Sequence, residues 1–451
     1  MAKYQKYAEY KDSGVEWLGE IPSHWDYFDG KRIFSSVRKQ ALSSDEQLAA
    51  SQKYGVIPQN LMMQLNDSKV MLALKGTESF RHVEKNNFVI SLRSFEGGIE
   101  HSNYEGCVSP AYTVLSSKKN IDYRYFKYLF KSAPFIAALQ STTDSLRDGK
   151  SISYEQFGNI TLPLFSKVEQ NTIANFLDHE TAKIDHLIEK QQQLIELLKE
   201  KRQAVISHAV TKGLNPNVAM KDSGVEWLGQ VPEHWQLVPL KYLCTFSGGG
   251  TPTKDNLSYW TDGNIPWVSP KDMKTFWISK TQDYITEKAV KESSTNTVEQ
   301  NSLLMVVRSG ILQRTIPIAI NTVPVTMNQD MKALKFGKRV LVEYIANLIH
   351  GNTVQLLLEW SKEGATVESI EHEYLANSLI PVPSLKEQEE ITQVIAKKMK
   401  VYAELTEKAE LQITLLQERR TTLISAAVTG KIDVRNWQAP TVAEADTELS
   451  A

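Results

Sequence analysis

Seven polar residues lie in or next to loops between predicted strands, where side chains are free to contact a groove of a nucleic acid. Lysine and arginine pair with phosphate oxygens, and arginine and asparagine also donate hydrogen bonds to base edges. For any one of them, a contact to phosphate alone or simple solvation of the loop remains an alternative. The candidate nucleic-acid-binding residues are Arg93, Arg147, Lys150, Lys271, Lys274, Arg308 and Asn328.

No stretch of the sequence completes a catalytic, cofactor or metal motif. Residues 149–151, Gly-Lys-Ser, resemble the end of a phosphate-binding loop, but Asp144 stands where its first glycine is required. The glycine-rich segment 248–253 lacks the spacing of a dinucleotide site, and the Asn/Asp-Pro-Pro-aromatic motif of an adenine methyltransferase is absent. His24 and His234 lack metal-ligand spacing and are interpreted as packing residues. We therefore expect no catalytic, cofactor-binding or metal-binding residue.

The composition indicates two globular cores and only local basic surface. The 451 residues are 41% hydrophobic, which is enough for two domains. Because the formal net charge is −2, any nucleic-acid surface must be local. Two cysteines, Cys107 and Cys244, exclude a disulfide framework and fit a reducing cytoplasm. The sequence shows neither an apolar export segment at residues 1–13 nor a membrane-length apolar run, so we expect a cytoplasmic protein.

One peptide occurs twice in the chain. The sequence Lys-Asp-Ser-Gly-Val-Glu-Trp-Leu-Gly stands at 11–19 and again at 221–229, and each copy runs on into Pro-x-His-Trp, at 22–25 and 232–235. An identical peptide of this length that contains Trp and two Gly does not arise by chance, so the chain is a duplication. The blocks between these anchors show no obvious similarity to each other. One frame with two dissimilar blocks predicts a two-fold molecule with two different binding units.

Each half ends in a long, strongly helical stretch, residues 167–210 and 386–428. In the first stretch, apolar residues recur every seven positions with a break at Gln191, and Leu187 and Leu194 each follow three residues after a member of that series. This spacing is an a/d coiled-coil pattern. About 44 helical residues span roughly 66 Å, which is too long for one small domain. The alternative is that each helix packs only on its own domain, but an antiparallel pair about a pseudo-two-fold axis explains both length and duplication.

The predicted fold class is α/β, of the mixed α+β kind, because short strands bounded by Gly, Pro and Asp precede helical segments in both blocks. Two such domains would be joined by the two long antiparallel helices. The predicted boundaries are 1–25 for an N-terminal anchor, 26–160 for the first domain, 161–214 for the first long helix, 215–235 for a linker and the repeated anchor, 236–382 for the second domain, 383–430 for the second long helix and 431–451 for a partly disordered tail.

This arrangement resembles the specificity subunit of Type I restriction-modification systems, over about residues 10 to 435. The frame carries the resemblance through its anchors and through Glu-Gln near the start of each long helix, at 169–170 and 387–388. The second block adds a series typical of the family's target-recognition domains: Gly-Gly-Thr-Pro at 249–252, Tyr-Trp at 259–260, Ile-Pro-Trp-Val-Ser-Pro-Lys-Asp-Met at 265–273, Arg308 and Met-Asn-Gln at 327–329. The first block resembles a different subtype through motifs at 54–58, 97–100, 109–112 and 147–150.

The resemblance implies a non-catalytic subunit that binds double-stranded DNA. Each target-recognition domain would read one half of a bipartite, asymmetric sequence, and the helices would set the spacer between the halves. Two modification subunits, which carry S-adenosylmethionine and methylate adenine, would dock on the helices, and restriction subunits that use ATP and Mg²⁺ would complete a complex for defence against foreign DNA. The chain itself would bind no cofactor. The alternative is a coiled-coil protein-interaction scaffold without DNA recognition.

Overall fold

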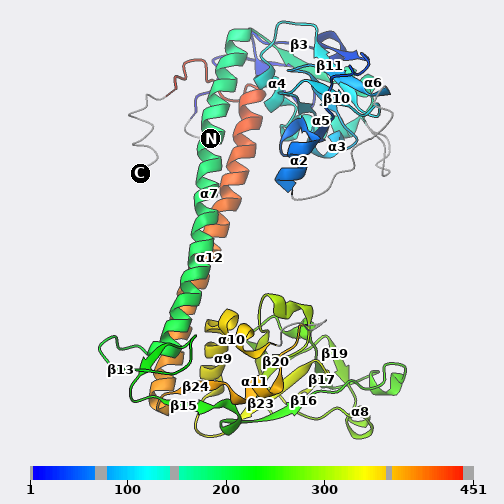
Figure 1. Cartoon of the computed structure of the whole chain (residues 1–451). Coiled ribbons are helices and arrows are strands. Elements are labelled where there is room, and N and C mark those ends of the chain that lie inside the picture. Colours follow the sequence, from blue (N-terminus) through cyan, green and yellow to red (C-terminus); the bar gives the residue numbers. More distant parts are fainter. Residues whose placement is uncertain (1–3, 67–78, 143–151, 362–367, 440–451) are drawn as a thin grey trace. The chain divides into compact units, whose positions relative to one another are not determined.

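The computed structural model describes residues 4–66, 79–142, 152–361 and 368–439. The chain forms two compact units, Met1–Gln191 with Leu411–Ala451 (unit 1) and Gln192–Glu410 (unit 2). Two long helices, α7 (Lys167–Lys212) and α12 (Leu385–Val428), continue from one unit into the other (Figure 1). Each unit therefore holds one half of each long helix, one anchor and one α/β domain.

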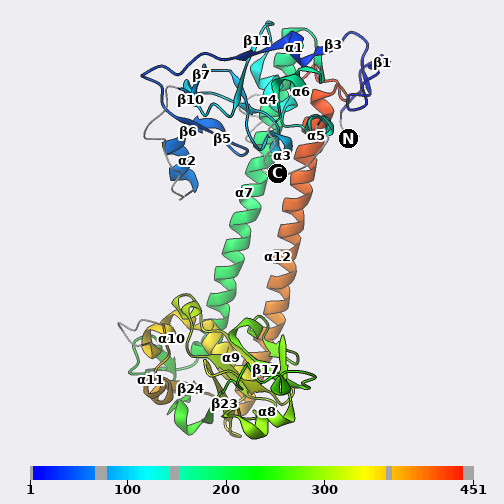
Figure 2. The ribbon, with the colours of Figure 1, turned by 90° about the vertical axis from the view of Figure 1, so that its right-hand side faces the viewer.

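The domain of unit 1 is built on an antiparallel four-stranded sheet in the order β4-β11-β8-β9. Two-stranded ladders surround it, and its helices follow the last sheet strand or lie in the loops (Figure 2). The sheet strands are β4 (Phe34–Val37), β8 (Phe88–Ile90), β9 (Glu100–His101) and β11 (Thr113–Ser117). The ladders pair β1 (Tyr10–Asp12) with β2 (Glu20–Pro22), β3 (Asp26–Asp29) with β12 (Thr161–Leu164), β5 (Leu48–Ser51) with β6 (Gly55–Pro58), and β7 (Arg81–Val83) with β10 (Gly106–Val108). The helices are α1 (Gly30–Ile33), α2 (Gln59–Asn66), α3 (Ser94–Gly97), α4 (Tyr123–Leu129), α5 (Ala133–Ser141) and α6 (Tyr154–Gly158).

The domain of unit 2 has a five-stranded sheet in the order β16-β23-β20-β21-β18 and a three-stranded sheet in the order β19-β17-β22. Their strands are β16 (Cys244–Gly248), β17 (Ile265–Val268), β18 (Trp277–Ile278), β19 (Asp283–Ile285), β20 (Leu303–Val306), β21 (Ile318–Asn321), β22 (Thr326–Met327) and β23 (Met331–Phe336). Two ladders pair β13 (Met220–Asp222) with β14 (Gln230–Pro232) and β15 (Gln236–Pro239) with β24 (Leu379–Val382). The helices are α8 (Glu287–Glu292), α9 (Val342–Gly351), α10 (Thr353–Trp360) and α11 (His372–Asn377). Short 3₁₀ turns are η2 (Leu240–Tyr242), η3 (Leu257–Tyr259), η4 (Pro270–Asp272) and η5 (Gly310–Gln313).

The two domains contain the same central arrangement of four strands, although their sequences look unrelated. In unit 1, Leu115 of β11 lies opposite Phe88 of β8, and in unit 2, Leu334 of β23 lies opposite Leu303 of β20. The strands β4, β8, β9 and β11 therefore correspond in order, direction and register to β16, β20, β21 and β23. Backbone hydrogen bonds define this match, and side-chain identity does not. The duplication thus covers the domains as well as the frame.

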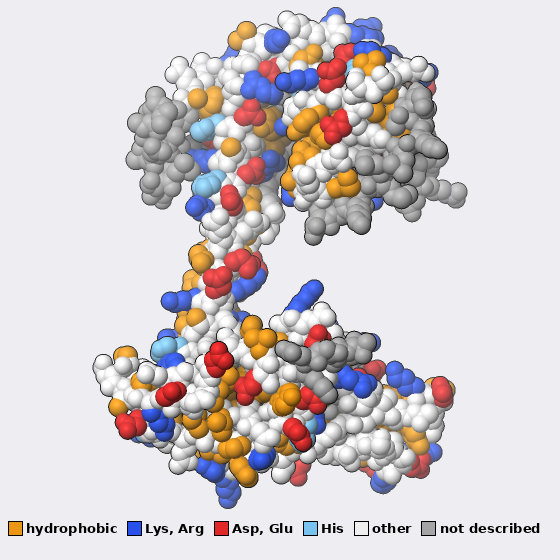
Figure 3. Space-filling view, viewed as in Figure 1, with side chains coloured by type: hydrophobic (Ala, Val, Ile, Leu, Met, Phe, Trp, Pro, Cys, Tyr) orange, Lys and Arg blue, Asp and Glu red, His pale blue; other side chains and the backbone are white. Residues whose placement is uncertain are grey.

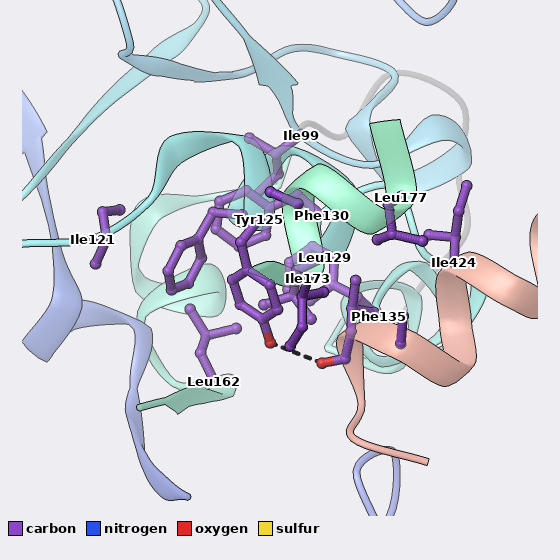
Figure 4. Packing of buried hydrophobic residues seen from close by; sticks show 14 of the residues in the cluster. Ile99, Ile121, Tyr125, Leu129, Phe130, Phe135, Leu162, Ile173, Leu177 and Ile424 are labelled. Atoms are coloured by element: carbon purple, nitrogen blue, oxygen red, sulfur yellow. Dashed lines mark hydrogen bonds between the residues drawn. The ribbon is translucent and has the colours of Figure 1, made fainter. Parts of the chain in front are cut away.

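The hydrophobic core of unit 1 joins α4 to both long helices. Tyr125 and Leu129 of α4 pack among Ile173 and Leu177 of α7 and Ile424 of α12 (Figure 4). Because a buried tyrosine hydroxyl needs a partner, Tyr125 donates to the carbonyl of Val428, at the end of α12, over 2.7 Å.

Unit 2 repeats this contact. Tyr344 of α9 is fully buried and donates to the carbonyl of Val210, near the end of α7, over 3.0 Å. In each unit, therefore, the domain holds the C-terminal end of one long helix beside the N-terminal part of the other. The helices run antiparallel within each unit, as the Arg420 to Asp185 contact of 2.8 Å in unit 1 also shows.

The predicted seam of the long helices is wrong in one detail. Leu187 and Leu194, expected to face the partner helix, are 40% and 42% exposed. The buried positions instead lie four residues after members of the seven-residue series: Thr181 follows Leu177, and Ile195 follows Gln191. A 3.5-residue repeat can be completed by a step of three or of four, so the apolar pattern alone does not choose between them. Thr181 lies 3.2 Å from the hydroxyl of Tyr128 on α4, and its own hydroxyl donates to the carbonyl of Leu177 over 2.7 Å, so its polar group is satisfied where α4 covers it.

The repeated anchors bind the starts of the long helices. Glu169 of α7 accepts hydrogen bonds from Trp25 over 3.0 Å and from Tyr7 over 2.8 Å, and it lies 2.9 Å from the ring of His24. In unit 2, Glu387 of α12 makes the same contacts with His234 and Trp235, each at 3.0 Å. The anchor histidines, interpreted from the sequence as packing residues, are thus hydrogen-bonding partners of the Glu-Gln motif.

Within unit 1 the start of the chain packs against its end. The hydroxyl of Tyr10 donates to the carbonyl of Gly430 over 3.1 Å, and the amide of Asp433 donates to the carbonyl of Gln5 over 2.8 Å. Ile432 and Val434 are buried. The first part of the predicted tail is therefore ordered against the anchor, whereas residues 440–451 lie outside the described residues.

Candidate DNA interface

In unit 2 four of the five motifs noted in the sequence come together. The amide of Gly250 donates to the carbonyl of Met327 over 2.8 Å, the amide of Asn328 to Val268 over 2.9 Å, and the amide of Arg308 to Asp330 over 3.3 Å. We name this set, residues 249–254, 269–272, 308–309 and 327–330, the recognition cluster. It consists of loops at the ends of β16, β17, β20 and β22, so a rigid sheet positions exposed side chains.

Two of these loops approach so closely that only glycine fits between them. A Cβ atom at position 249 would lie 1.9 Å from the carbonyl oxygen of Asn328. Any larger residue would force the loops apart. The loops are also tied by Gly250, whose carbonyl accepts hydrogen bonds from Trp267 over 3.1 Å and from Thr295 over 2.9 Å. The Gly-Gly-Thr-Pro motif therefore serves to hold the cluster together.

Arg308 is an exposed charged group of the cluster that forms an ion pair within it. Its side chain is 62% exposed, and its Nε lies 3.1 Å from Oδ1 of Asp330. The carbonyl of Asp330 also accepts the amide of Val307 over 2.8 Å. Asn328 is only 7% exposed, and its Oδ1 accepts the amide of Asp330 over 3.1 Å. Asn328 thus shapes the loop that carries Asp330, and its side chain points inward in the free protein.

The two predicted lysines of unit 2 lie in different surroundings. Lys271 is exposed on the turn η4 (Pro270–Asp272), which belongs to the recognition cluster. Lys274 is also exposed, but it lines a groove of about 990 Å³ beside α7 and α12, together with Arg202 and the exposed Trp277. The structure therefore brings Lys271, Arg308 and Asn328 together and leaves Lys274 outside that cluster.

In unit 1 the structure places Arg93 where unit 2 has Arg308. Each arginine is five residues beyond a matched strand position, Phe88 or Leu303, and each is followed by serine. Arg93 is exposed at the start of α3. This Arg-Ser pair at the end of two buried strands is a sequence signal that reasoning from the sequence missed. Arg147 and Lys150, the other predicted residues of this unit, lie outside the described residues.

A buried ion pair between Glu100 and Lys131 contacts the loop that follows Arg93. Gly98, with φ of 80°, would bring a Cβ within 2.0 Å of the carbonyl oxygen of Phe130. Glu100 is 1% exposed and pairs with Lys131, whose ammonium also donates to the carbonyl of Gly97 over 2.8 Å. Burial raises the pKa of Glu100 to about 7, although Lys131 opposes that shift. The Gly-Gly-Ile-Glu motif is therefore a support for the loop that starts at Arg93.

One face of the molecule is electrostatically mixed. On the face shown in Figure 3, Lys and Arg side chains are interspersed with Asp and Glu, and no broad basic patch appears. Among the described residues, no group of three or more His, Cys, Asp or Glu side chains is arranged to hold a metal ion. None of the described helices has the length and apolar character needed to cross a bilayer.

Comparison with known proteins agrees with this organisation. The model of the Type I restriction modification DNA specificity domain matches residues 22–197 and 232–415. The EcoR124I/EcoR124II specificity subunit of Escherichia coli is 37% identical over 204 residues, which are 45% of this chain and 48% of that protein, so this match spans about half of the relative. A putative MjaX specificity subunit of Methanocaldococcus jannaschii is 23% identical over 93% of this chain and 96% of its own length.

Two solved structures have the same fold. A chain from a study of complex assembly and conformational transition of the type I R-M system superposes with a TM-score of 0.69 at 12% identity, covering 90% of this chain and 98% of that one. The HsdS subunit of Thermoanaerobacter tengcongensis gives 0.56 at 13% identity, with 91% and 98% covered. With two matched specificity domains that together cover most of its length, the chain belongs to the family of Type I restriction-modification DNA specificity subunits.

Proposed function

We propose that this chain recognises a bipartite, asymmetric sequence in double-stranded DNA and directs partner methyltransferase and restriction subunits to it. The observation that carries the proposal is a shared sheet with different loops. Arg93 and Arg308 occupy equivalent positions, yet the residues around them differ. Two readers of the same construction with unlike contact residues would read two unlike half-sites.

Partner binding is proposed for the outer faces of the long helices. Leu187 and Leu197 of α7 are 40% and 61% exposed, and the matching Leu405 and Leu415 of α12 are 42% and 48% exposed. Exposed leucines on a helix indicate a protein contact when they recur at equivalent positions. A duplicated pair of such faces fits two copies of one partner, which we propose to be the modification subunit.

The chemistry would reside in those partners. Specificity subunits are non-catalytic in general, and this sequence completes no cofactor motif. S-adenosylmethionine, ATP and Mg²⁺ would be bound by the modification and restriction subunits. A protein-interaction scaffold without DNA recognition would also expose leucines on its helices, but it would not need exposed arginines on equivalent strand ends.

The test is methylation by reconstituted mixtures. The chain with its modification subunit should methylate adenine in one bipartite duplex sequence, and binding should weaken steeply with salt. The chain alone should transfer no labelled methyl group and cut no DNA. Methyl transfer by the isolated chain would refute the division of labour, and a mixture that binds or methylates without sequence preference would favour the scaffold.

A further inference from the structure

The two equivalent arginines differ in one partner. Arg308 pairs with Asp330, which lies four residues before Leu334 of β23. In unit 1 the residue four positions before the matched Leu115 is Ala111. No described residue forms an ion pair with Arg93. The carboxylate is therefore a feature that unit 2 has and unit 1 lacks at the same place in the same sheet.

The Asp330 contact leaves the outer edge of the Arg308 guanidinium open. Only Nε is near the carboxylate, at 3.1 Å, and the two Nη groups form no hydrogen bond with any described residue. The carboxylate is itself held, because Asn328 and the strand end bind its backbone. This contact is an ion pair, and Oδ1 of Asp330 accepts no hydrogen bond from a described residue. An arginine paired on its Nε side keeps the planar pair of Nη donors available, and the ion pair reduces the rotamer entropy that is lost when they bind.

The charge of this pair argues against phosphate as the target. A carboxylate 3.1 Å from Nε offsets part of the positive charge of Arg308, and it would repel a phosphate that approached from the same side. Neutral acceptors are not repelled in this way. In the major groove, guanine alone presents two adjacent acceptors, O6 and N7, that match two parallel N–H donors, because adenine places a donor beside its N7.

Resting on the function proposed above, we propose that Arg308 reads a guanine through the major groove in the half-site bound by unit 2, and that Asp330 is a positioning residue for it. The half-site of unit 2 then contains a G·C pair at that position. Arg93 has no such partner among the described residues, so the inference concerns the half-site of unit 2 alone.

The experiment uses the full chain with its modification subunit and a DNA library randomised over the methylated sequence. Arg308→Lys and Arg308→Gln should each relax one G·C position by roughly 10- to 100-fold, the discrimination of one good bidentate contact. The other half-site should be unchanged. Arg314→Gln, which removes an exposed charge outside the recognition cluster, is the matched control and should leave the sequence preference unaltered.

Asp330→Asn separates positioning from simple support of the fold. This change keeps the shape of the side chain and removes its charge. Discrimination at the same G·C position should fall, while binding to unrelated DNA should strengthen, because the charge of Arg308 is no longer partly offset. Lys271→Gln should instead weaken binding to all sequences alike and lower the salt slope by about 1.

Three results would overturn the inference: no G·C pair in the half-site of unit 2, an unaltered preference in both Arg308 variants, or a uniform loss for all sequences, which marks a phosphate contact. Thermal unfolding of each variant shows whether it is folded, and Arg308→Lys retains the charge if Arg308→Gln does not fold. If the unsubstituted complex methylates without sequence preference, the proposed function itself fails. The two failures are therefore distinguishable.

Discussion

At the scale of single residues, the supports of the recognition loops are as informative as the exposed groups. Glu100 lies under the loop that begins at Arg93, and its Oε2 has no hydrogen-bond partner among the described residues. Burial raises its pKa from the usual 4.5 to about 7. Because its pKa is higher in the folded state than in the unfolded state, protonation of this carboxyl stabilises the folded state.

This residue predicts a pH dependence of stability. Because the folded-state pKa is the higher one, the contribution of Glu100 is fully present below pH 4.5 and is lost as the pH rises towards 7. Glu100→Gln stays neutral throughout. The free energy of unfolding of the variant, relative to the parent, should therefore rise between pH 5 and pH 8, by up to about 3 kcal/mol. Urea unfolding at both pH values measures this, and parallel pH profiles would contradict it.

At the scale of elements, one motif fastens each anchor to a long helix. Glu169 is 7% exposed and binds three donors, Tyr7, His24 and Trp25, whereas Glu387 is 25% exposed and binds His234 and Trp235. The neighbouring glutamines repeat as well. Gln170 accepts the amide of Asp122, and Gln388 that of Leu341, each over 2.8 to 2.9 Å. The Glu-Gln motif is thus a joint between frame and domain.

Removing the glutamate should loosen this joint unequally. Glu169→Ala leaves two buried donors, Tyr7 and Trp25, and the half-exposed His24 without an acceptor, so we expect it to lower the stability of unit 1 by about 3 kcal/mol. Glu387→Ala should cost roughly half as much, because its site is wetter and has fewer donors. Thermal unfolding followed by tryptophan fluorescence compares the two. An equal or reversed order would show that the anchors depend on packing instead.

The space between the domain and the long helix is filled by a side chain in unit 1 and is open in unit 2. In unit 1, the hydroxyl of Tyr128 on α4 donates to Asp178 of α7 over 2.7 Å. In unit 2 the matching positions are Asn347 and Ala396, and they line the groove of about 990 Å³. The space that a tyrosine fills in one unit is therefore hollow in the other, because shorter side chains occupy the equivalent sites.

At the scale of the whole molecule, the long helices are continuous through both units. The 46 residues of α7 span about 69 Å at a rise of roughly 1.5 Å per residue. A continuous helix transmits a change in its length without a change in the domains at its ends. Helix length and base recognition should therefore be separable properties.

Lengthening the helices tests this separation. Four residues inserted before Leu198, with a matching four in α12, lengthen each helix by about 6 Å, against a base-pair rise of about 3.4 Å. The spacer of the methylated sequence should grow by one or two base pairs while both half-sequences persist, or activity should be lost because the helix register is broken. Mapping of methylated adenines in genomic DNA gives the result.

Exchange of residues 236–380 for another domain of the family is the complementary control. It should alter one half-sequence and leave the spacer unchanged. An insertion that changed the recognised bases but not their separation would refute the proposal that the helices act as a ruler.

The sequence by itself determined the duplication, the two long helices, the mixed α/β domains and the family. These features depend on local signals: an exact repeat, an apolar period near 3.5 residues, and turn residues between short apolar runs. It also singled out Arg93 and Arg308 as exposed loop residues, because each follows a buried strand. Whether these arginines contact bases stays a prediction.

Only the tertiary structure decided how distant parts meet. It showed one sheet in two dissimilar domains, since backbone pairing depends on hydrogen bonds that many side chains permit. It buried Thr181 beside Tyr128 of α4 and left Leu187 exposed, because contacts with the domain, which the seven-residue pattern does not encode, decide which side chains are covered. Arg308 and Asp330 are 22 residues apart in the chain, and their contact depends on strand order that no local pattern encodes. Local patterns in a single sequence do not specify which distant strands pair, so contacts of this kind come from the tertiary structure alone.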